Sequence, residues 1–276
     1  MTKDLHEERA RMIRATEVTR LARLITYLED CVDISLVPYN RVTKYDSRLF
    51  RYTMGEVLPP DRLFFCGRDL AVLNATKTVA FGGTVSPVEE AFELAGYLSA
   101  LAVTCHRKRD VVVISGGAIG IDLAAHLGAI GKSGKTVAVV AGAPANGLNS
   151  LVDKHSLVTK MIIECGGGII SERNGDYHSS VALSQRDRII TALSDIFVAV
   201  ECKANSGTVD TAKRAKIQGK SVIAIDWNNI KEKRHSPQSK GCDQLIREGI
   251  ARPVPSCEVQ DIFDAVFKRQ FLALIG

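Results

Sequence analysis

Three short segments of the chain combine glycine with hydroxyl side chains, and each stands just before a segment of helical character. They are Gly82-Gly83-Thr84, Ser115-Gly116-Gly117 with Gly120 one turn later, and Ser206-Gly207-Thr208. Glycine lets a backbone approach an anion closely, and the N–H groups and dipole of a helix N-terminus favour negative charge. Hydroxyl groups add further hydrogen-bond donors. Together the three segments predict a groove that binds phosphate groups.

Three basic residues are expected near the same groove. Arg186 and Arg188 open a helical run, and Lys203 follows an apolar run. Arginine binds phosphate through two parallel hydrogen bonds, whereas lysine acts as a point charge. Because two residues that are two positions apart point to different faces of a helix, either arginine can instead pair with a carboxylate such as Asp187 or Asp195. The sequence leaves the choice between phosphate contact and internal ion pair open.

Two carboxylates stand beside these segments. Asp122 lies where a helix begins after the second glycine segment, and Glu201 ends an apolar run. We interpret both as structural groups at the site, with Asp122 capping or bracing its loop. His126, one turn after Asp122, is interpreted as a buried histidine. Acid–base chemistry would need a sugar or base held between the carboxylates, and no Ser/His/Asp or Cys/His pattern stands out. The sequence therefore predicts no catalytic residue and a protein that is not an enzyme.

Cofactor and metal sites are not indicated. The segment "SGGAIG" does not match G-x-G-x-x-G, and the strand that follows, "TVAVVAGAP", ends without the acidic residue that would bind a ribose hydroxyl of NAD. The segment "GAIGKSGKT" does not have the spacing of a P-loop. The seven cysteines include no pair with C-x-x-C spacing, so reduced thiols are expected rather than a zinc site.

The elements that must position these residues follow a regular alternation. Six short apolar runs, each ending in glycine or polar residues, are separated by helical segments. They cover residues 78–83, 111–117, 136–142, 167–172, 196–201 and 221–226. Continuously apolar strands indicate a sheet covered by helices on both faces. The expected fold is therefore a Rossmann-like α/β fold, with a doubly wound and mostly parallel sheet of about six or more strands. Its ligands are expected at the carboxyl ends of the strands.

Two regions follow from this alternation. Residues 1–75 are predicted to hold an amphipathic helix over residues 5–30 and a connector, which together form a short N-terminal helical extension. Residues 76–276 are predicted to form the Rossmann-like domain. The last stretch, from residue 259, has an apolar helical face typical of a core or dimer contact.

The bulk composition limits the possible partners. The 276 residues have a formal net charge of +5, which permits a polyanionic partner without requiring one. No apolar run is long enough for a membrane span. The first residues carry acidic groups and no apolar core of a signal peptide. A cytoplasmic protein without membrane contact is expected.

Four segments, in order along the chain, resemble the DprA/Smf family. They are "ISGGAIGIDLAAHLGAI", "SERNGDYHSSVALSQRDRIITALSD", "VECKANSGTVDTAKRAKIQGKSVIAI" and "SKGCDQLIREGIARPV". The resemblance implies a Rossmann-like fold and binding of single-stranded DNA in DNA processing. It also implies a homodimer that protects transforming DNA during uptake and recombination, and that passes the strand to RecA.

The chain departs from the family pattern at three positions of the site. Val85 and Ile119 replace arginines of the family motifs, and Asp187 replaces an asparagine. Compared with the family motifs, the site thus has two positive charges fewer and one negative charge more. The chain therefore resembles a diverged member of the family. An alternative is a nucleotide-binding or nucleotide-sensing protein, or a weak nucleotide hydrolase, in a mobile-element or defence setting. Thr211 stands where such hydrolases carry a glutamate, which disfavours hydrolysis.

Overall fold

The computed structural model of the chain describes eight stretches of the sequence. They are residues 40–42, 60, 63–75, 77–104, 111–142, 152–173, 180–229 and 237–255. The helix predicted over residues 5–30 and the apolar helical face predicted after residue 259 lie outside the described residues.

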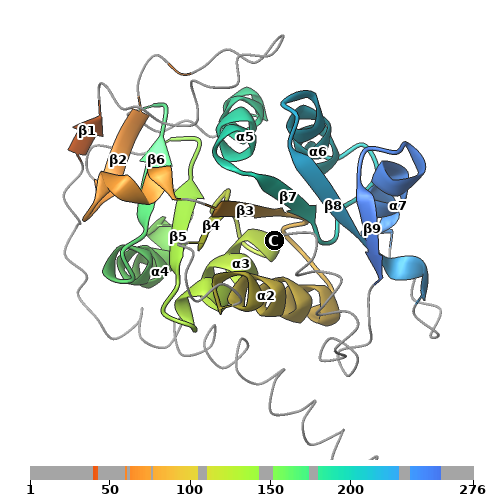
Figure 1. The fold of residues 1–276 in the computed structure, drawn as a ribbon, viewed down its shortest axis with the longest axis horizontal. Helices are drawn as coiled ribbons and strands as arrows, with labels where there is room; N and C mark the ends of the chain where they lie inside the picture. Colours follow the sequence, from red (N-terminus) through yellow and green to blue (C-terminus); the bar gives the residue numbers. More distant parts are fainter. Residues whose placement is uncertain are drawn as a thin grey trace, which may run out of the picture.

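One sheet organises the described residues, with helices on both of its faces (Figure 1). Its strands are β1 (Asn40–Val42), β2 (Leu63–Gly67), β3 (Lys77–Gly82), β4 (Val111–Ser115), β5 (Lys135–Val139), β6 (Gly168–Ser171), β7 (Ile196–Ala199), β8 (Ser221–Asp226) and β9 (Arg252–Pro255). The order across the sheet is β1-β2-β6-β5-β4-β3-β7-β8-β9. The strands from β3 to β9 run parallel to one another. The expected doubly wound, mostly parallel sheet is confirmed.

The helices follow the strands in alternation. They are α2 (Glu89–Thr104), α3 (Ile121–Ile130), α4 (Val152–Glu164), α5 (Ser180–Leu193), α6 (Gly207–Ile217) and α7 (Lys240–Arg247), with short 3-10 helices at Leu70–Asn74 and Trp227–Asn229. Helices α2 and α3 pack together on one face of the sheet, and α5 and α6 pack together on the other (Figure 1). Gly219 follows the end of α6 with a left-handed φ of +73°, a conformation common after a helix C-terminus.

The chain changes direction across the sheet at β3. It first adds β4, β5 and β6 on one side of β3, and then returns to add β7, β8 and β9 on the other side. The loops that follow β3 and β7 therefore leave the sheet in opposite directions. Such a switch point is where open α/β sheets leave room for a ligand.

Among the described residues, two strands precede residue 76. Strand β2 pairs antiparallel with β6, and β1 pairs antiparallel with β2. They cover the edge of β6 that would otherwise expose unpaired backbone groups. Part of the segment predicted to be a connector thus belongs to the sheet, while the position at which a separate domain begins stays a prediction.

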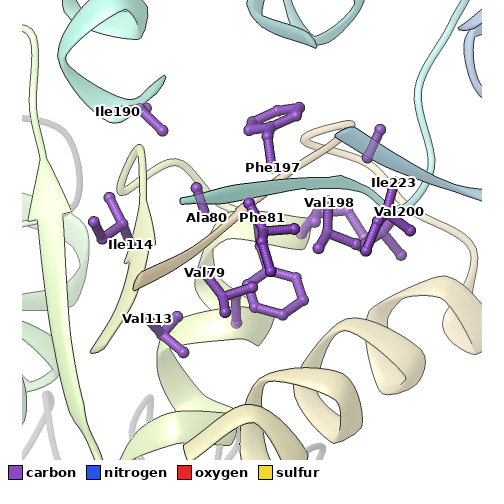
Figure 2. Packing of buried hydrophobic residues seen from close by; sticks show 14 of the residues in the cluster. Val79, Ala80, Phe81, Val113, Ile114, Ile190, Phe197, Val198, Val200 and Ile223 are labelled. Carbon is purple, nitrogen blue, oxygen red and sulfur yellow. The ribbon is translucent and has the colours of Figure 1, made fainter. Parts of the chain in front are cut away.

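The core lies on both faces of the central strands. Ala80 of β3 is paired in register with Phe197 of β7, and Phe81 with Val198. Successive strand residues point to opposite faces, so the two phenylalanine rings lie on opposite sides of the sheet. Figure 2 shows this, with the Phe197 ring on the same side as Ile190 of α5. Both rings are almost fully buried.

Candidate functional site

A cavity of about 400 Å³ opens at the carboxyl ends of β3 and β7, at the switch point of the sheet. The β3–α2 and β7–α6 loops form its rim, and α5 and α6 form its flanks. Residues predicted as phosphate ligands line it from both loops: Gly82, Gly83, Thr84, Lys203, Ser206, Gly207 and Thr208. Asp122 and Arg186, also predicted at the site, line it as well. The structure thus brings the first and third glycine segments together.

The β7–α6 loop offers backbone N–H groups at the start of α6 to this cavity. Ser206 is the N-cap of α6, but its side chain makes no capping hydrogen bond. Its Oγ is buried and has no hydrogen-bond partner among the described residues. Gly207 is exposed, and a methyl group on its α-carbon would meet no atom within 4 Å. Because the first N–H groups of a helix have no partner inside it, this end of α6 offers donors to an anion.

Lys203 belongs to the same loop and lines the cavity. Its side chain is exposed, and it makes no salt bridge with any residue that the structure describes. Asn205, two residues later, has a left-handed backbone with φ of 55°. The N–H of Asn205 donates to Oε1 of Gln244 in α7 at 3.1 Å. The loop is thus held to α7 while its lysine remains in solvent.

The β3–α2 loop is held in place by Glu201. The backbone oxygen of Glu201 accepts from the N–H of Thr84 at 2.7 Å, and its Oε2 accepts from the N–H of Val88 at 3.0 Å. A side chain at Gly83 would collide with that same backbone oxygen. Glu201 is 1% exposed, and burial raises the pKa of its carboxyl group. These contacts give Glu201 a bracing position at the site.

The β4–α3 loop, in contrast, uses its polar groups internally. Ser115, Gly116, Gly117 and Gly120 are buried, and the cavity lining does not include them. The Ser115 hydroxyl donates to the backbone oxygen of Phe81 at 2.8 Å. The four residues support the cavity wall without lining it. Their contact with phosphate stays a prediction.

Gly120 shows why this loop needs glycine. Its φ of 84° and ψ of −129° are accessible only to glycine. A methyl group there would collide with the backbone of Thr84 and Val85. The close approach lets the N–H of Ile121 donate to the Thr84 oxygen at 3.2 Å. The glycine therefore joins the first two glycine segments to each other.

Arg186 lies between the cavity and the β4–α3 loop. One terminal nitrogen donates to the backbone oxygens of Gly116 and, at 2.8 Å, Val139. Its Nε donates to Asp187 Oδ1 at 2.9 Å. The side chain is only 11% exposed. Its donors therefore serve mainly to hold three elements together.

Arg188 does not reach the cavity. Its guanidinium makes two hydrogen bonds to the Glu172 carboxylate, at 2.8 and 2.5 Å, and a third to the Gln185 backbone oxygen at 2.7 Å. Of the two alternatives that the sequence left open, the structure gives Arg188 the internal ion pair. A partner for it was not evident, because Glu172 is distant in sequence and comes close only through the fold.

One buried carboxylate, Asp122, and one half-buried carboxylate, Asp187, face the same cavity. Burial raises the pKa of Asp122 to about 6, although Arg186 and the N–H of Ala118 favour its ionised form. The Ala118 N–H donates to Asp122 Oδ2 at 3.2 Å, which is the bracing contact expected for this residue. Burial also raises the pKa of Asp187, with Arg186 acting in the opposite direction. The interior of the cavity is therefore not strongly positive.

The apolar wall of the cavity was not predicted from the sequence. Leu183 and Ile190 of α5 line it with Phe197 of β7, and Figure 2 shows the last two on the same side of the sheet. Asp187 and Thr211 also line it. Apolar residues that line a cavity have the same spacing as those that fill a core, so periodicity does not separate the two cases.

Comparison with known proteins assigns the chain to a family. The family model of DNA recombination-mediator protein A matches residues 42–267. The chain belongs to this family. The match includes all the described residues that line the cavity.

Relatives from several bacteria agree with this assignment. The chain is similar to DNA processing protein DprA of Streptococcus pneumoniae, with 27% identity over 201 residues, 72% of this chain and 66% of that protein. It is 25% identical to the Bacillus subtilis DprA over 224 residues, 81% of this chain and 70% of that protein. The chain thus spans about two thirds of the length of these relatives.

Solved structures of this family share the fold. The X-ray structure of the S. pneumoniae protein matches with a TM-score of 0.61 and 27% identity, covering 83% of this chain and 74% of that chain. The Helicobacter pylori DNA processing protein A matches with a TM-score of 0.67 and 21% identity, covering 87% of this chain and 98% of that chain. The Rossmann-like architecture expected from the family resemblance is confirmed.

Among the described residues, no helix is both long and apolar enough to cross a membrane. The same residues contain no cluster of three histidine, cysteine or acidic side chains arranged to hold a metal ion.

Proposed function

We propose that this chain binds single-stranded DNA, with the phosphate backbone on the β7–α6 loop. The observation that carries the proposal is the start of α6, where an exposed glycine and an N-cap serine without a capping bond leave backbone N–H groups available. Lys203 adds an exposed positive charge on the same loop. Backbone N–H groups and a lysine recognise phosphates without reading bases.

Family membership supports this choice of ligand. The S. pneumoniae and B. subtilis relatives are DNA processing proteins. The structure of the H. pylori protein is described for its single-stranded DNA binding mode. In this chain, Lys203 and the start of α6 lie at the carboxyl edge of the sheet, where ligands of this architecture bind.

The proposal is for binding without catalysis. Thr211 lies in the cavity where the glutamate of related nucleotide hydrolases is expected, and its hydroxyl donates to the Gly207 backbone oxygen at 2.7 Å. Asp122 and Asp187 are both engaged with neighbouring donors. We expect no release of base or phosphate when the protein is incubated with nucleotides, measured by chromatography of the products.

Two finer elements of the proposal concern partners. We expect a homodimer, which would extend the DNA-binding track over two copies, and transfer of the bound strand to RecA. Light scattering after gel filtration measures the first. The rate of RecA filament formation on protein-coated DNA, with and without this chain, measures the second.

A second candidate is a protein that binds a small nucleotide. The cavity of about 400 Å³ falls in the range of small-molecule sites. Val85 and Ile119, which are 53% and 48% exposed, place apolar side chains on loops where the family resemblance leads us to expect arginines. A thermal-shift screen of free nucleotides tests this candidate, because a ligand of the native state raises Tm.

The salt dependence of binding tests the main proposal. We expect the chain to bind oligo-dT with an affinity that falls steeply as salt rises, because phosphate contacts release counterions. Fluorescence anisotropy at several salt concentrations measures the slope. Absence of binding at micromolar protein in low salt would contradict the proposal.

A further inference from the structure

We propose that Cys202 and Cys242 form a redox-sensitive pair, which a peroxide closes into a disulfide between the β7–α6 loop and α7. The disulfide itself does not depend on the function proposed above. Its second consequence, weaker binding of DNA by the oxidised protein, rests on that function because Cys202 directly precedes Lys203.

The two thiols already lie in contact, although the cysteines are 40 positions apart in the sequence. Their sulfur atoms are 3.9 Å apart, and neither is in a disulfide. The backbones meet as well, since the N–H of Gly241 donates to the Cys202 backbone oxygen at 2.7 Å. A disulfide has a sulfur–sulfur distance of about 2.05 Å, so closure of the pair requires a movement of about 2 Å.

Cys202 is the member of the pair that a small oxidant reaches first. Its side chain lines the cavity, although only 1% of the residue is exposed, whereas Cys242 is fully buried in the core. The neighbouring Cys202 thiol and burial hold the pKa of Cys242 well above its usual range. Because the thiolate is the reactive form of cysteine, we expect the reaction to begin at Cys202 and to be slow.

Hydrogen peroxide supplies the oxidising equivalents for the reaction. The deprotonated Cys202 sulfur attacks one peroxide oxygen, the O–O bond breaks, and one water leaves while the sulfur keeps a hydroxyl group. The Cys242 sulfur then attacks the Cys202 sulfur and loses its proton, and the hydroxyl group leaves as a second water. Two thiols and one peroxide thus give one disulfide and two waters, and the peroxide takes up two electrons.

Closure should displace the loop more than the helix. Cys242 belongs to α7, and its sulfur contacts the backbone oxygens of Ala199 and Val200 at 3.7 and 3.5 Å. Cys202 belongs to a loop, so the adjustment falls on it and on Lys203 beside it. We expect the oxidised protein to bind oligo-dT about twofold to fivefold more weakly, the effect of losing one exposed ion pair.

A peptide map tests the disulfide directly. Trypsin releases Cys202 in the peptide 189–203 and Cys242 in the peptide 241–247, and each peptide contains one cysteine. After peroxide treatment of the folded protein and alkylation of the remaining thiols, we expect mass spectrometry to detect the two peptides joined. Dithiothreitol should separate them. The map uses the wild type, so it does not depend on how well a variant folds.

The matched control for the map is Cys66→Ala. It removes a buried thiol outside the pair, and the joined peptides should form as they do in the wild type. Absence of the joined peptides, or their formation only in protein that urea has unfolded before oxidation, would overturn the proposal.

Tryptophan fluorescence follows the same reaction in solution. Trp227 is the only tryptophan of the chain. Its indole N–H donates to the Val200 oxygen at 2.7 Å, the same oxygen that the Cys242 sulfur contacts. Because a disulfide quenches a nearby indole, we expect peroxide to lower the emission of the wild type and dithiothreitol to restore it. Cys242→Ala should keep its emission, and an equal reversible fall in this variant would contradict the assignment.

Oligo-dT binding separates this proposal from the proposed function. Fluorescence anisotropy with a labelled oligo-dT should show weaker binding by the oxidised wild type than by the reduced wild type. Cys242→Ala should bind equally before and after peroxide. Joined peptides with unchanged affinity would uphold the disulfide and overturn its effect on binding. Joined peptides with no binding by either form would uphold the disulfide and overturn the proposed function.

Discussion

The β4–α3 and β7–α6 loops look alike in sequence, since each has a serine followed by glycine just before a helix, but the structure uses them differently. In the β4–α3 loop, the Ser115 hydroxyl bonds to a neighbouring strand, and Gly116 accommodates the Arg186 guanidinium. In the β7–α6 loop, the Ser206 hydroxyl has no partner among the described residues, and Gly207 faces open space. The comparison shows that one loop builds the site and the other is open to a ligand.

The same distinction separates the cations. Arg186 and Arg188 are 11% and 14% exposed and bonded to protein oxygens, whereas Lys203 is exposed. An arginine whose donors are already used contributes rigidity rather than affinity.

Removing the Arg186 side chain should have the largest effect. Arg186→Ala leaves Asp122 and Asp187 without their nearby cation and two backbone oxygens without a donor. We expect the free energy of unfolding to fall by about 3–5 kcal/mol, as for a broken buried ion pair. Chemical denaturation measures it. The control is Arg214→Ala, which removes surface hydrogen bonds to Ser184 and should cost about 1 kcal/mol or less. Equal losses of unfolding free energy in the two variants would show that the Arg186 contacts do not stabilise the fold.

Alanine at the two glycines compares the loops directly. Gly120→Ala should destabilise the fold by about 3 kcal/mol, because the backbone conformation is strained for alanine and the methyl group collides with Thr84 and Val85. Gly207→Ala meets no atom and should leave stability unchanged or raise it by less than about 1 kcal/mol. Urea titration of both variants gives the two values. If Gly207→Ala were as destabilising as Gly120→Ala, the two loops would not differ as described.

The pH dependence of stability should separate two buried groups on α3. The raised pKa of Asp122, about 6, means that the folded protein takes up a proton first, so stability increases as pH falls through 6. Burial lowers the pKa of His126 from 6.5 to about 3, so the unfolded chain takes up a proton first, and stability decreases below 6.5.

The two effects can be measured in two variants. Between pH 7 and pH 5, we expect Asp122→Asn to lose about 1 kcal/mol relative to the wild type, and His126→Gln to gain about 2 kcal/mol relative to it. Urea unfolding at both pH values provides the numbers. If the free energy of unfolding changed with pH in the same way in all three proteins, neither group would have a pKa that differs between the folded and unfolded states.

Much of the fold could be predicted from the sequence. The six apolar runs became β3 to β8, because strands buried on both faces have a clear hydrophobic signal. The edge strands were missed for physical reasons. Strand β9, "RPVP", contains two prolines, which are compatible with an edge but unlike a typical strand sequence. Strand β2 follows a Pro59-Pro60 break and lacks a following crossover helix that would mark it as part of the alternation.

The part of the site that is built from glycine-containing loops could be predicted from the sequence. Glycine before a helix identified the β7–α6 and β3–α2 loops, and both line the cavity. Side-chain partners far apart in sequence were not predictable, which is why Arg188 could not be assigned to Glu172 or Ser115 to Phe81. The apolar wall at Leu183 and Ile190 has the spacing of an ordinary helix face, so nothing in the sequence distinguishes it from core.

The most direct test of this account compares Lys203→Ala with Lys216→Ala. Both lysines are exposed, one beside the start of α6 and the other in its last turn. For oligo-dT measured by anisotropy over a range of salt, we expect Lys203→Ala to lower affinity and to reduce the slope of log affinity against log salt by about one. Lys216→Ala should leave both unchanged. Equal effects of the two substitutions, or none at Lys203, would contradict the claim that DNA binds at the β7–α6 loop.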